Sequence, residues 1–182
     1  MTKAIRILKE GGIILYPSDT IWGIGCDATN SVAVTRIYDL KQRIESKSMI
    51  CLVSDTDMLK QYVEAIPHEA LTLLSQSTKP TTIVYDKAIN LAKNIIAEDG
   101  SIGIRVVKNG FCHDLVKAFK KPIVSTSANI SGTKSPRAFK EIQDKILTGV
   151  DYVVNLPDNS NKPVPSSVVK ITNDGFITVL RA

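Results

Sequence analysis

The sequence has few of the residues that commonly mark a redox, metal-binding or membrane protein. Among its 182 residues are three cysteines, two histidines and one tryptophan. Cys26, Cys51 and Cys112 lie far apart and form no CxxC pair, so we expect free thiols and a cytoplasmic location. No apolar run reaches the roughly 20 residues that a membrane-spanning helix needs, and residues 1–9 are too charged for the core of a signal peptide.

Familiar nucleotide-binding motifs are missing as well. The sequence contains no Gly-x-x-x-x-Gly-Lys followed by Ser or Thr, which excludes a P-loop. Gly23, Gly25 and Ala28 fit the letters of a dinucleotide fingerprint. However, Thr29 and Asn30 separate them from the next expected helix, and the following strand does not end in a suitable acidic residue. A Rossmann site is therefore the weaker interpretation.

Histidine chemistry is also poorly supported. Neither His68 nor His113 stands in a polar motif, and no Ser-His-Asp or Cys-His arrangement can be assembled. Cys112 is adjacent to His113, but adjacent side chains rarely converge on one ion, so we expect no metal held by the protein. An enzyme with this sequence would work by positioning and charge neutralisation rather than through a protein nucleophile.

The composition is that of a globular protein with a mild excess of positive charge. The chain is 43% hydrophobic and 23% charged, with a net charge of +5 and a pI near 9.1. Such a balance attracts phosphates, whether on nucleotides or on RNA. The charge does not distinguish the two, because there is no long basic tail.

Apolar periodicity predicts strands and helices in alternation. The expected strands are 13–16, 49–53, 81–85, 101–107, 122–124, 152–154, 167–171 and 176–180, with 21–28 a loop or a further short strand. The expected helices are 2–10, 32–41, 56–65, 68–75, 91–97, 111–119 and 138–147. This order favours one α/β domain over residues 1–182 with a mixed sheet.

The most informative stretch is 121–132, Lys-Pro-Ile-Val-Ser-Thr-Ser-Ala-Asn-Ile-Ser-Gly. Its expected strand, 122–124, is followed by short polar side chains at Ser125, Thr126, Ser127, Asn129 and Ser131. Polar groups at the carboxyl end of a strand build sites in open α/β sheets, and hydroxyls and amides suit phosphate, ribose and amino-acid groups. The alternative is an ordinary turn that caps the next helix.

Cations stand in two other segments. Lys41 and Arg43 end a predicted helix, with Lys47 shortly after, and positions i and i+2 do not share a helical face. Either the two charges diverge, or Arg43 lies past the helix end; the plain alternative is a solvated helix terminus. Arg105 stands inside an apolar strand, where it needs a partner or the exposed face of an edge strand. Its planar fork suits a carboxylate or a phosphate.

Six segments form a wider pattern in order along the chain. They are Tyr-Pro-Ser-Asp-Thr-Ile-Trp-Gly-Ile-Gly-Cys-Asp-Ala at 16–28, Lys-Gln-Arg at 41–43, Gly-Ile-Arg-Val at 103–106, Ser-Ala-Asn-Ile-Ser-Gly at 127–132, Pro-Ser-Ser-Val-Val at 165–169 and Leu-Arg at 180–181. Together they resemble the YrdC family, the threonylcarbamoyl-AMP synthases, over nearly the whole chain. Ile44 departs from the usual proline and Ser167 from the usual threonine. The end at Ala182 resembles the short single-domain form.

The resemblance implies a twisted open mixed sheet with flanking helices and a concave basic cavity. It implies a nucleotidyltransferase that converts L-threonine, bicarbonate and ATP into threonylcarbamoyl-AMP and pyrophosphate. ATP would be a substrate, with Mg²⁺ carried by its phosphates. Partner proteins would then transfer the threonylcarbamoyl group to the tRNA adenosine just 3′ of the anticodon. Because the attacking carbamate oxygen is already charged, the reaction needs no protein base.

The resemblance also implies roles for single residues. By motif position, the ATP contacts would be Arg43, Lys47, Ser127, Ser135 and Arg181, with Lys41 beside them. The threonine contacts would be Thr20, Arg105, Ser125 and Ser166. Asn129 would hold the loop or the nucleotide, and the catalytic set would be Lys41, Arg43, Ser127 and Asn129.

Two other functions fit the same residues. A non-catalytic module could use a basic cavity to bind double-stranded RNA or tRNA. A paralogue of the same fold could act on another small substrate, because the Lys-x-Arg and Ser-x-Asn segments do not exclude it. Of these possibilities, only a threonylcarbamoyl-AMP synthase would make an adenylate whose formation depends on threonine.

Overall fold

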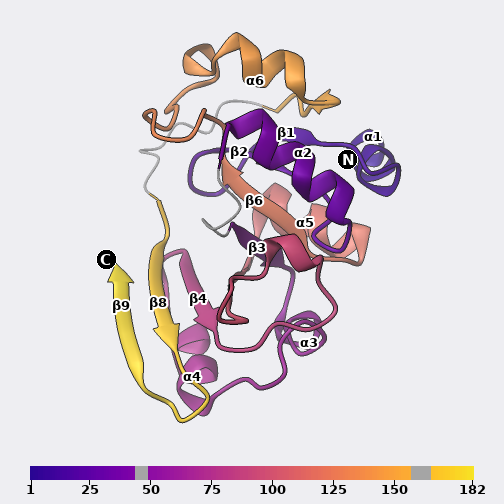
Figure 1. The fold of residues 1–182 in the computed structure, drawn as a ribbon. Coiled ribbons are helices and arrows are strands. Elements are labelled where there is room, and N and C mark those ends of the chain that lie inside the picture. The colour runs from indigo at the N-terminus through magenta and orange to yellow at the C-terminus, as the bar shows by residue number, and fades with distance from the viewer. Residues whose placement is uncertain (44–48, 157–164) are drawn as a thin grey trace.

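One nine-stranded mixed sheet runs through the molecule (Figure 1). The computed structural model describes residues 1–43, 49–156 and 165–182. The strand order is β7-β1-β2-β6-β3-β5-β4-β8-β9. The strands are β1 (Ile14–Pro17), β2 (Trp22–Gly25), β3 (Ile50–Val53), β4 (Thr81–Tyr85), β5 (Ile102–Val106), β6 (Ile123–Ser127), β7 (Tyr152–Val153), β8 (Ser167–Ile171) and β9 (Ile177–Arg181). The mixed α/β sheet predicted from the sequence is confirmed.

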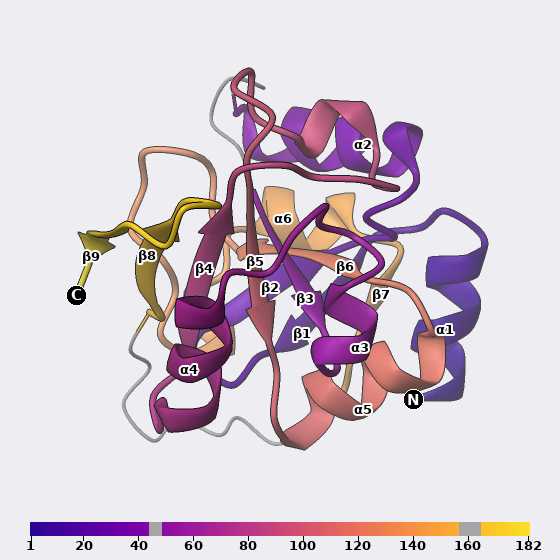
Figure 2. The ribbon, with the colours of Figure 1, turned by 90° about the horizontal axis from the view of Figure 1, so that it is seen from below.

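Helices cover the sheet from two sides. The α-helices are α1 (Thr2–Lys9), α2 (Ser31–Lys41), α3 (Thr56–Leu59), α4 (His68–Gln76), α5 (Gly110–Phe119) and α6 (Asp144–Gly149), with 3₁₀ turns at Lys93–Ile95 and Phe139–Glu141. Figure 2 shows α2 on one side of the sheet and α1 with α5 on the other. Accordingly, α1 and α5 share one buried apolar cluster, and α2 and α6 belong to a second. No helix of the described residues is long and apolar enough to cross a membrane.

The end of α2 is built for a change of direction. The Asn30 side chain caps the first turn by accepting from the amides of Val32 and Ala33 at 3.0 and 3.1 Å. At the other end, Gln42 takes a left-handed conformation, with φ of 50°, and the Arg43 amide donates to Tyr38 at 2.9 Å. Arg43 therefore lies past the helix end, as one of the two sequence interpretations required.

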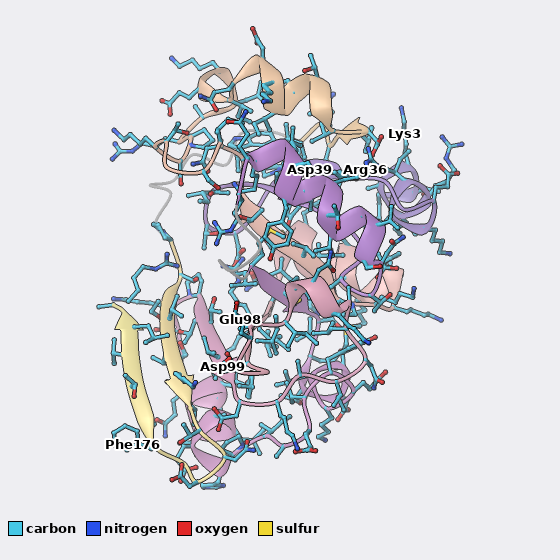
Figure 3. All side chains as sticks on the ribbon, in the orientation of Figure 1. Lys3, Arg36, Asp39, Glu98, Asp99 and Phe176 are labelled. Carbon is cyan, nitrogen blue, oxygen red and sulfur yellow. The ribbon has the colours of Figure 1, made fainter. Side chains whose placement is uncertain are left out.

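The sheet edge at β9 is little covered. All five residues of β9 are exposed, and β9 pairs with β8 alone among the described strands. Phe176 begins this edge segment and projects from it at the lower left of Figure 3, with 67% of its surface exposed. The β8–β9 hairpin predicted from the sequence is confirmed. Gly175 takes a positive φ of 88°, which gives the turn its shape.

Four predicted elements differ from the structure. Strand 122–124 continues to Ser127, because β6 pairs with β2 and β3 on both sides. Helix 138–147 is divided by extended backbone at Ile142 and Gln143. Helix 56–65 ends at Leu59, because residues 62–64 bond instead to the backbone of 87–89. Helix 91–97 is only the turn Lys93–Ile95, since the Ala92 amide bonds to the distant Ala28 carbonyl and the Ala97 amide bonds forward to the Ser101 carbonyl.

A matched pair of glycines tests how closely β2 and β6 approach. A Cβ at Gly25 would stand 2.3 Å from the Val124 carbonyl oxygen, whereas one at Gly23 would meet nothing nearer than 3.5 Å. We expect Gly25→Ala to lower the free energy of unfolding by about 1–3 kcal/mol, because the backbone must move. Gly23→Ala should change it much less. Urea unfolding of both variants checks this, and equal losses would contradict it.

Candidate functional site

A cavity of about 320 Å³ opens on the sheet face that also carries α1 and α5. Its walls come from the β1–β2 loop, the end of α2, strands β3, β5 and β6, and the β8–β9 edge. The lining residues are Ser18, Thr20, Ile21, Gly23, Arg43, Met49, Ile50, Arg105, Ser125, Thr126, Ser127, Ser135, Pro165, Ser166, Val168 and Arg181.

Strand pairing explains why these residues meet. Ile50 of β3 pairs with Ser125 on one side and Gly103 on the other, and Gly23 pairs with Ser127. Directly paired residues share a face of a sheet, so the side chains of Ile50, Ser125 and Ser127 lie on the same face. Gly23, which has no side chain, lines the cavity directly.

A buried tyrosine orients one of the cavity hydroxyls. Tyr16 donates from its hydroxyl to Ser125 Oγ at 2.9 Å. Burial raises the pKa of Tyr16 far above its usual value, so the phenol stays neutral and remains a donor. With its oxygen already accepting this bond, Ser125 can turn its own hydrogen toward a ligand.

An ion pair lies beside Ser125. Arg105 is 3% exposed and donates from Nη2 to Asp19 Oδ1 at 2.8 Å. Strand β5 lies between β3 and β4, so the edge-strand alternative for Arg105 is wrong. Its Nε is buried and has no partner among the described residues. A buried donor without a partner costs free energy, and a ligand acceptor in the cavity would relieve that cost.

The β1–β2 loop brings Thr20 to the cavity and Asp19 to Arg105. Ser18 Oγ accepts from the amides of Thr20 and Ile21, each at 3.1 Å, and donates to the Ile21 carbonyl at 2.5 Å. Short serine turns of this kind hold a loop without regular pairing. Thr20 therefore lines the cavity while Asp19 reaches the guanidinium.

The opposite rim joins Arg181 to Ser166. Arg181 donates from Nε and Nη2 to the Ser166 carbonyl at 3.0 and 2.7 Å. Ser166 Oγ in turn lies 2.9 Å from Thr82 Oγ1. These bonds connect β9, the last strand, to β4 two strands further into the sheet, and they hold a cation at the cavity wall.

The two cations of the Lys-x-Arg segment separate. Arg43 lines the cavity, and burial lowers the pKa of its guanidinium. Lys41 is 1% exposed and runs beneath β6, where Nζ donates to the carbonyls of Ser127 and Asn129 at 2.5 and 2.7 Å. Burial, assisted by Arg43, lowers the pKa of Lys41 to about 7, whereas the two carbonyls favour the charged form.

The structure brings most of the predicted site residues to one cavity. Those that line it are Thr20, Arg43, Arg105, Ser125, Ser127, Ser135, Ser166 and Arg181. Lys41 and Asn129 lie outside the lining: the Asn129 amide donates to the carbonyls of Ile130 and Thr133 and so holds the loop after β6. Lys47 lies outside the described residues, as does Ile44.

Sequence reasoning missed two supporting residues. Nothing in the sequence indicates that Tyr16 faces Ser125, since their contact depends on the register of strands 109 positions apart. Asp19 stands in the 16–28 segment. An arginine inside an apolar strand needs an acidic partner, and this need was an available signal for the ion pair. No group of three or more His, Cys, Asp and Glu suited to a metal occurs among the described residues.

Together the fold and the cavity define an open-sheet α/β protein with a cationic, hydroxyl-lined site for an anionic ligand. The Sua5/YciO/YrdC family model, described as "Telomere recombination", matches residues 6–182. The chain belongs to this family.

Named relatives agree with this membership. The chain is 32% identical over 173 residues to the Threonylcarbamoyl-AMP synthase of Pseudoalteromonas translucida, covering 93% of this chain and 92% of the relative. Among solved structures, P. abyssi Sua5 complexed with L-threonine has a TM-score of 0.86 at 24% identity, over 93% of this chain and 50% of that one. Full-length HypF in a phosphate- and nucleotide-bound form has a TM-score of 0.85 at 23% identity, over 98% and 28%.

The solved structures and the named relatives support different conclusions. The two solved structures show the shared fold, and the chain spans about half the length of the solved Sua5 chains. It spans most of the curated relatives, which share the name Threonylcarbamoyl-AMP synthase at 28–32% identity.

The Arg105–Asp19 pair gives a prediction about stability. Asp19→Asn leaves a buried guanidinium without its anion, and because Asp19 is itself 26% exposed, water offsets part of the loss. We expect the free energy of unfolding to fall by about 1–3 kcal/mol. Glu64→Gln, which breaks an exposed pair with Lys87, should change it by less than about 0.5 kcal/mol. Thermal and urea unfolding measure both, and equal effects would show that Arg105 does not need Asp19.

Proposed function

We propose that this protein is a threonylcarbamoyl-AMP synthase that uses L-threonine, bicarbonate and ATP. The observation that carries the proposal is the buried Arg105, whose Nε lacks a partner among the described residues beside the hydroxyls of Ser125 and Thr20. The relatives' shared name supports the same activity.

The end of the cavity at Arg105 suits threonine. A planar guanidinium with a remaining donor can take the amino-acid carboxylate. Thr20, Ser125 and Ser166 offer hydroxyls for the threonine side chain and for its polar groups. The neighbouring Asp19 carboxylate would balance the positive charge of Arg105, so that the site does not hold a second anion too tightly.

The end at Arg43 suits the nucleotide. Arg43 and Arg181 supply charge for phosphates, and Ser127 and Ser135 supply neutral donors. Lys47, predicted from the sequence to join them, remains part of this proposal. A cavity of about 320 Å³ open to solvent would enclose the reacting ends of both substrates and leave the rest of the nucleotide along the rim.

The reaction follows from bringing two anions together. The threonine amine attacks bicarbonate carbon, water leaves, and a carbamate forms. A carbamate oxygen then attacks the α-phosphorus of ATP, and pyrophosphate leaves with the electron pair of the broken P–O bond. Arg43 and Arg181 would offset the repulsion between carbamate and phosphate, and the fixed hydroxyls would hold the attacking oxygen in line.

Magnesium would arrive with the nucleotide rather than be held by the protein. The lining residues of the cavity include hydroxyls and guanidinium groups but no carboxylate, and Mg²⁺ prefers oxygen anions. These residues therefore fit a metal that the triphosphate oxygens already hold. When bound there, it would neutralise phosphate charge.

The wider setting follows from the product. We propose that the adenylate passes to proteins that transfer the threonylcarbamoyl group to tRNA, in the cytoplasm. The three cysteines are free and buried, in keeping with a reducing compartment.

The direct test is synthesis of the adenylate. With radiolabelled bicarbonate, ATP and threonine, we expect a labelled adenylate and one pyrophosphate for each, both absent without threonine. Valine should react far more slowly, because it leaves the buried hydroxyls unpaired at about 1–3 kcal/mol each. Adenylate formation with another acid but not with threonine would point to a paralogue. Tight tRNA binding without any adenylate would favour the non-catalytic module.

Two arginine variants should affect different substrates. Arg105→Lys keeps the charge but loses the planar fork, so the KM for threonine should rise more than that for ATP. Arg43→Ala should reduce kcat/KM for ATP by roughly 10- to 150-fold, because charged hydrogen bonds contribute about 1.5–3 kcal/mol. Steady-state kinetics with each substrate varied in turn measures both. The assignment is wrong if the two variants have the same pattern.

A further inference from the structure

The ammonium of Lys41 occupies a site built from backbone oxygens. Nζ donates to the carbonyls of Ser127 and Asn129, two residues that flank the end of β6. The Lys41 side chain is among the largest that are fully buried. Carbonyl oxygens that converge on a buried cation resemble the surroundings of a bound monovalent ion. Here the cation is the Lys41 ammonium, which is covalently attached to α2.

The attachment runs in both directions. The Ser131 amide donates to the Lys41 carbonyl at 2.8 Å, so the last residue of α2 binds the loop through its backbone and through its side chain. Within the loop, Asn129 closes the turn to Thr133 with a 2.6 Å bond from its amide. The segment 127–133 is thus held at its start by the Lys41 ammonium and further along by the Lys41 backbone.

Lys41 is separated from the cavity by the strand that it holds. Its neighbour Arg43 lines the cavity, and so does Ser127, whose carbonyl accepts from Lys41. Direct contact between Lys41 and a phosphate would require the ammonium to leave both carbonyls. Among the described residues, the Ser127 carbonyl would then keep only its bond from the Asn129 backbone amide at 2.9 Å, and the Asn129 carbonyl would keep no donor, which is unfavourable.

We propose that Lys41 is a positioning residue: its ammonium acts as an internal cation that fixes the backbone of 127–131 and so aims the Ser127 hydroxyl at the nucleotide end of the cavity. This role deepens the proposed synthase activity and rests on it for its consequence in catalysis. The clamp itself exists without substrate, so it can be tested apart from that activity.

The experiment compares amide hydrogen exchange in the substrate-free protein for Lys41→Met and Arg43→Met. Lys41→Met keeps the length of the side chain and removes its donors. We expect exchange at Ser131 and Thr133 to accelerate roughly ten- to a hundredfold, since charge-assisted bonds that fix the loop are lost. Arg43→Met removes a neighbouring cation from the cavity wall and should leave exchange in the loop unchanged.

Chemical rescue of a second variant tests the same role if Lys41→Met folds poorly. Lys41→Ala removes three methylenes and the ammonium, so added n-propylammonium has the size and charge to refill the site. It should restore protection of the loop without ATP or threonine, and n-propanol, which has a single hydroxyl donor and no charge, should restore much less. In the adenylate assay, Lys41→Met should lower kcat, whereas Arg43→Met should mainly raise the KM for ATP.

The outcomes separate the two roles. Wild-type exchange in Lys41→Met together with weaker ATP binding would overturn the proposal and make Lys41 a ligand of the nucleotide. Equal acceleration in both Met variants, or no rescue of Lys41→Ala by n-propylammonium, would also overturn it. Loss of the proposed adenylate activity in the wild-type protein would leave the exchange result standing, so failure of the function and failure of the clamp can be told apart.

Discussion

The close pairing of β6 with β2 and β3 is the constraint on which the site depends. Strand β6 is antiparallel to both neighbours, and only a glycine at position 25 allows the Val124 carbonyl to come so near. Because β6 is held on both edges, its three consecutive hydroxyl residues lie in a strand rather than in a loop. Their positions are therefore set by backbone hydrogen bonds, which preorganises them for a ligand.

The cations of the site divide into two kinds by their surroundings. Lys41 and Arg105 are almost fully buried and are already engaged, one by carbonyls and one by a carboxylate. Arg105 also lines the cavity, as do the less buried Arg43 and Arg181. A buried charge needs compensation within the protein, whereas a charge at the wall can also be compensated by the substrate. The arrangement thus places fixed charge behind the hydroxyls and adaptable charge around them.

How much of the fold and the site could be predicted from the sequence depends on how far apart in sequence the interacting residues lie. The alternation of strands and helices and the β8–β9 hairpin depend on local periodicity and on Gly175, and these were predicted. The end of helix α3 and the length of β6 depend on partners that are distant in sequence, and these were not. The resemblance to the YrdC family named eight of the residues that line the cavity. It could not separate Lys41 from Arg43, because burial beneath β6 is a property of the packed chain.

The exposed edge strand β9 connects peripheral motion to the chemistry of the cavity. Every residue of β9 is exposed, and local stability is lowest where few apolar contacts hold an element. The strand nevertheless carries Arg181, whose bonds to Ser166 complete the cavity wall. No residue of β9 belongs to the buried core, so fraying of this edge would remove a cation from the site before the core opens. Affinity for an anionic ligand in this fold therefore depends on how stably β9 remains paired with β8.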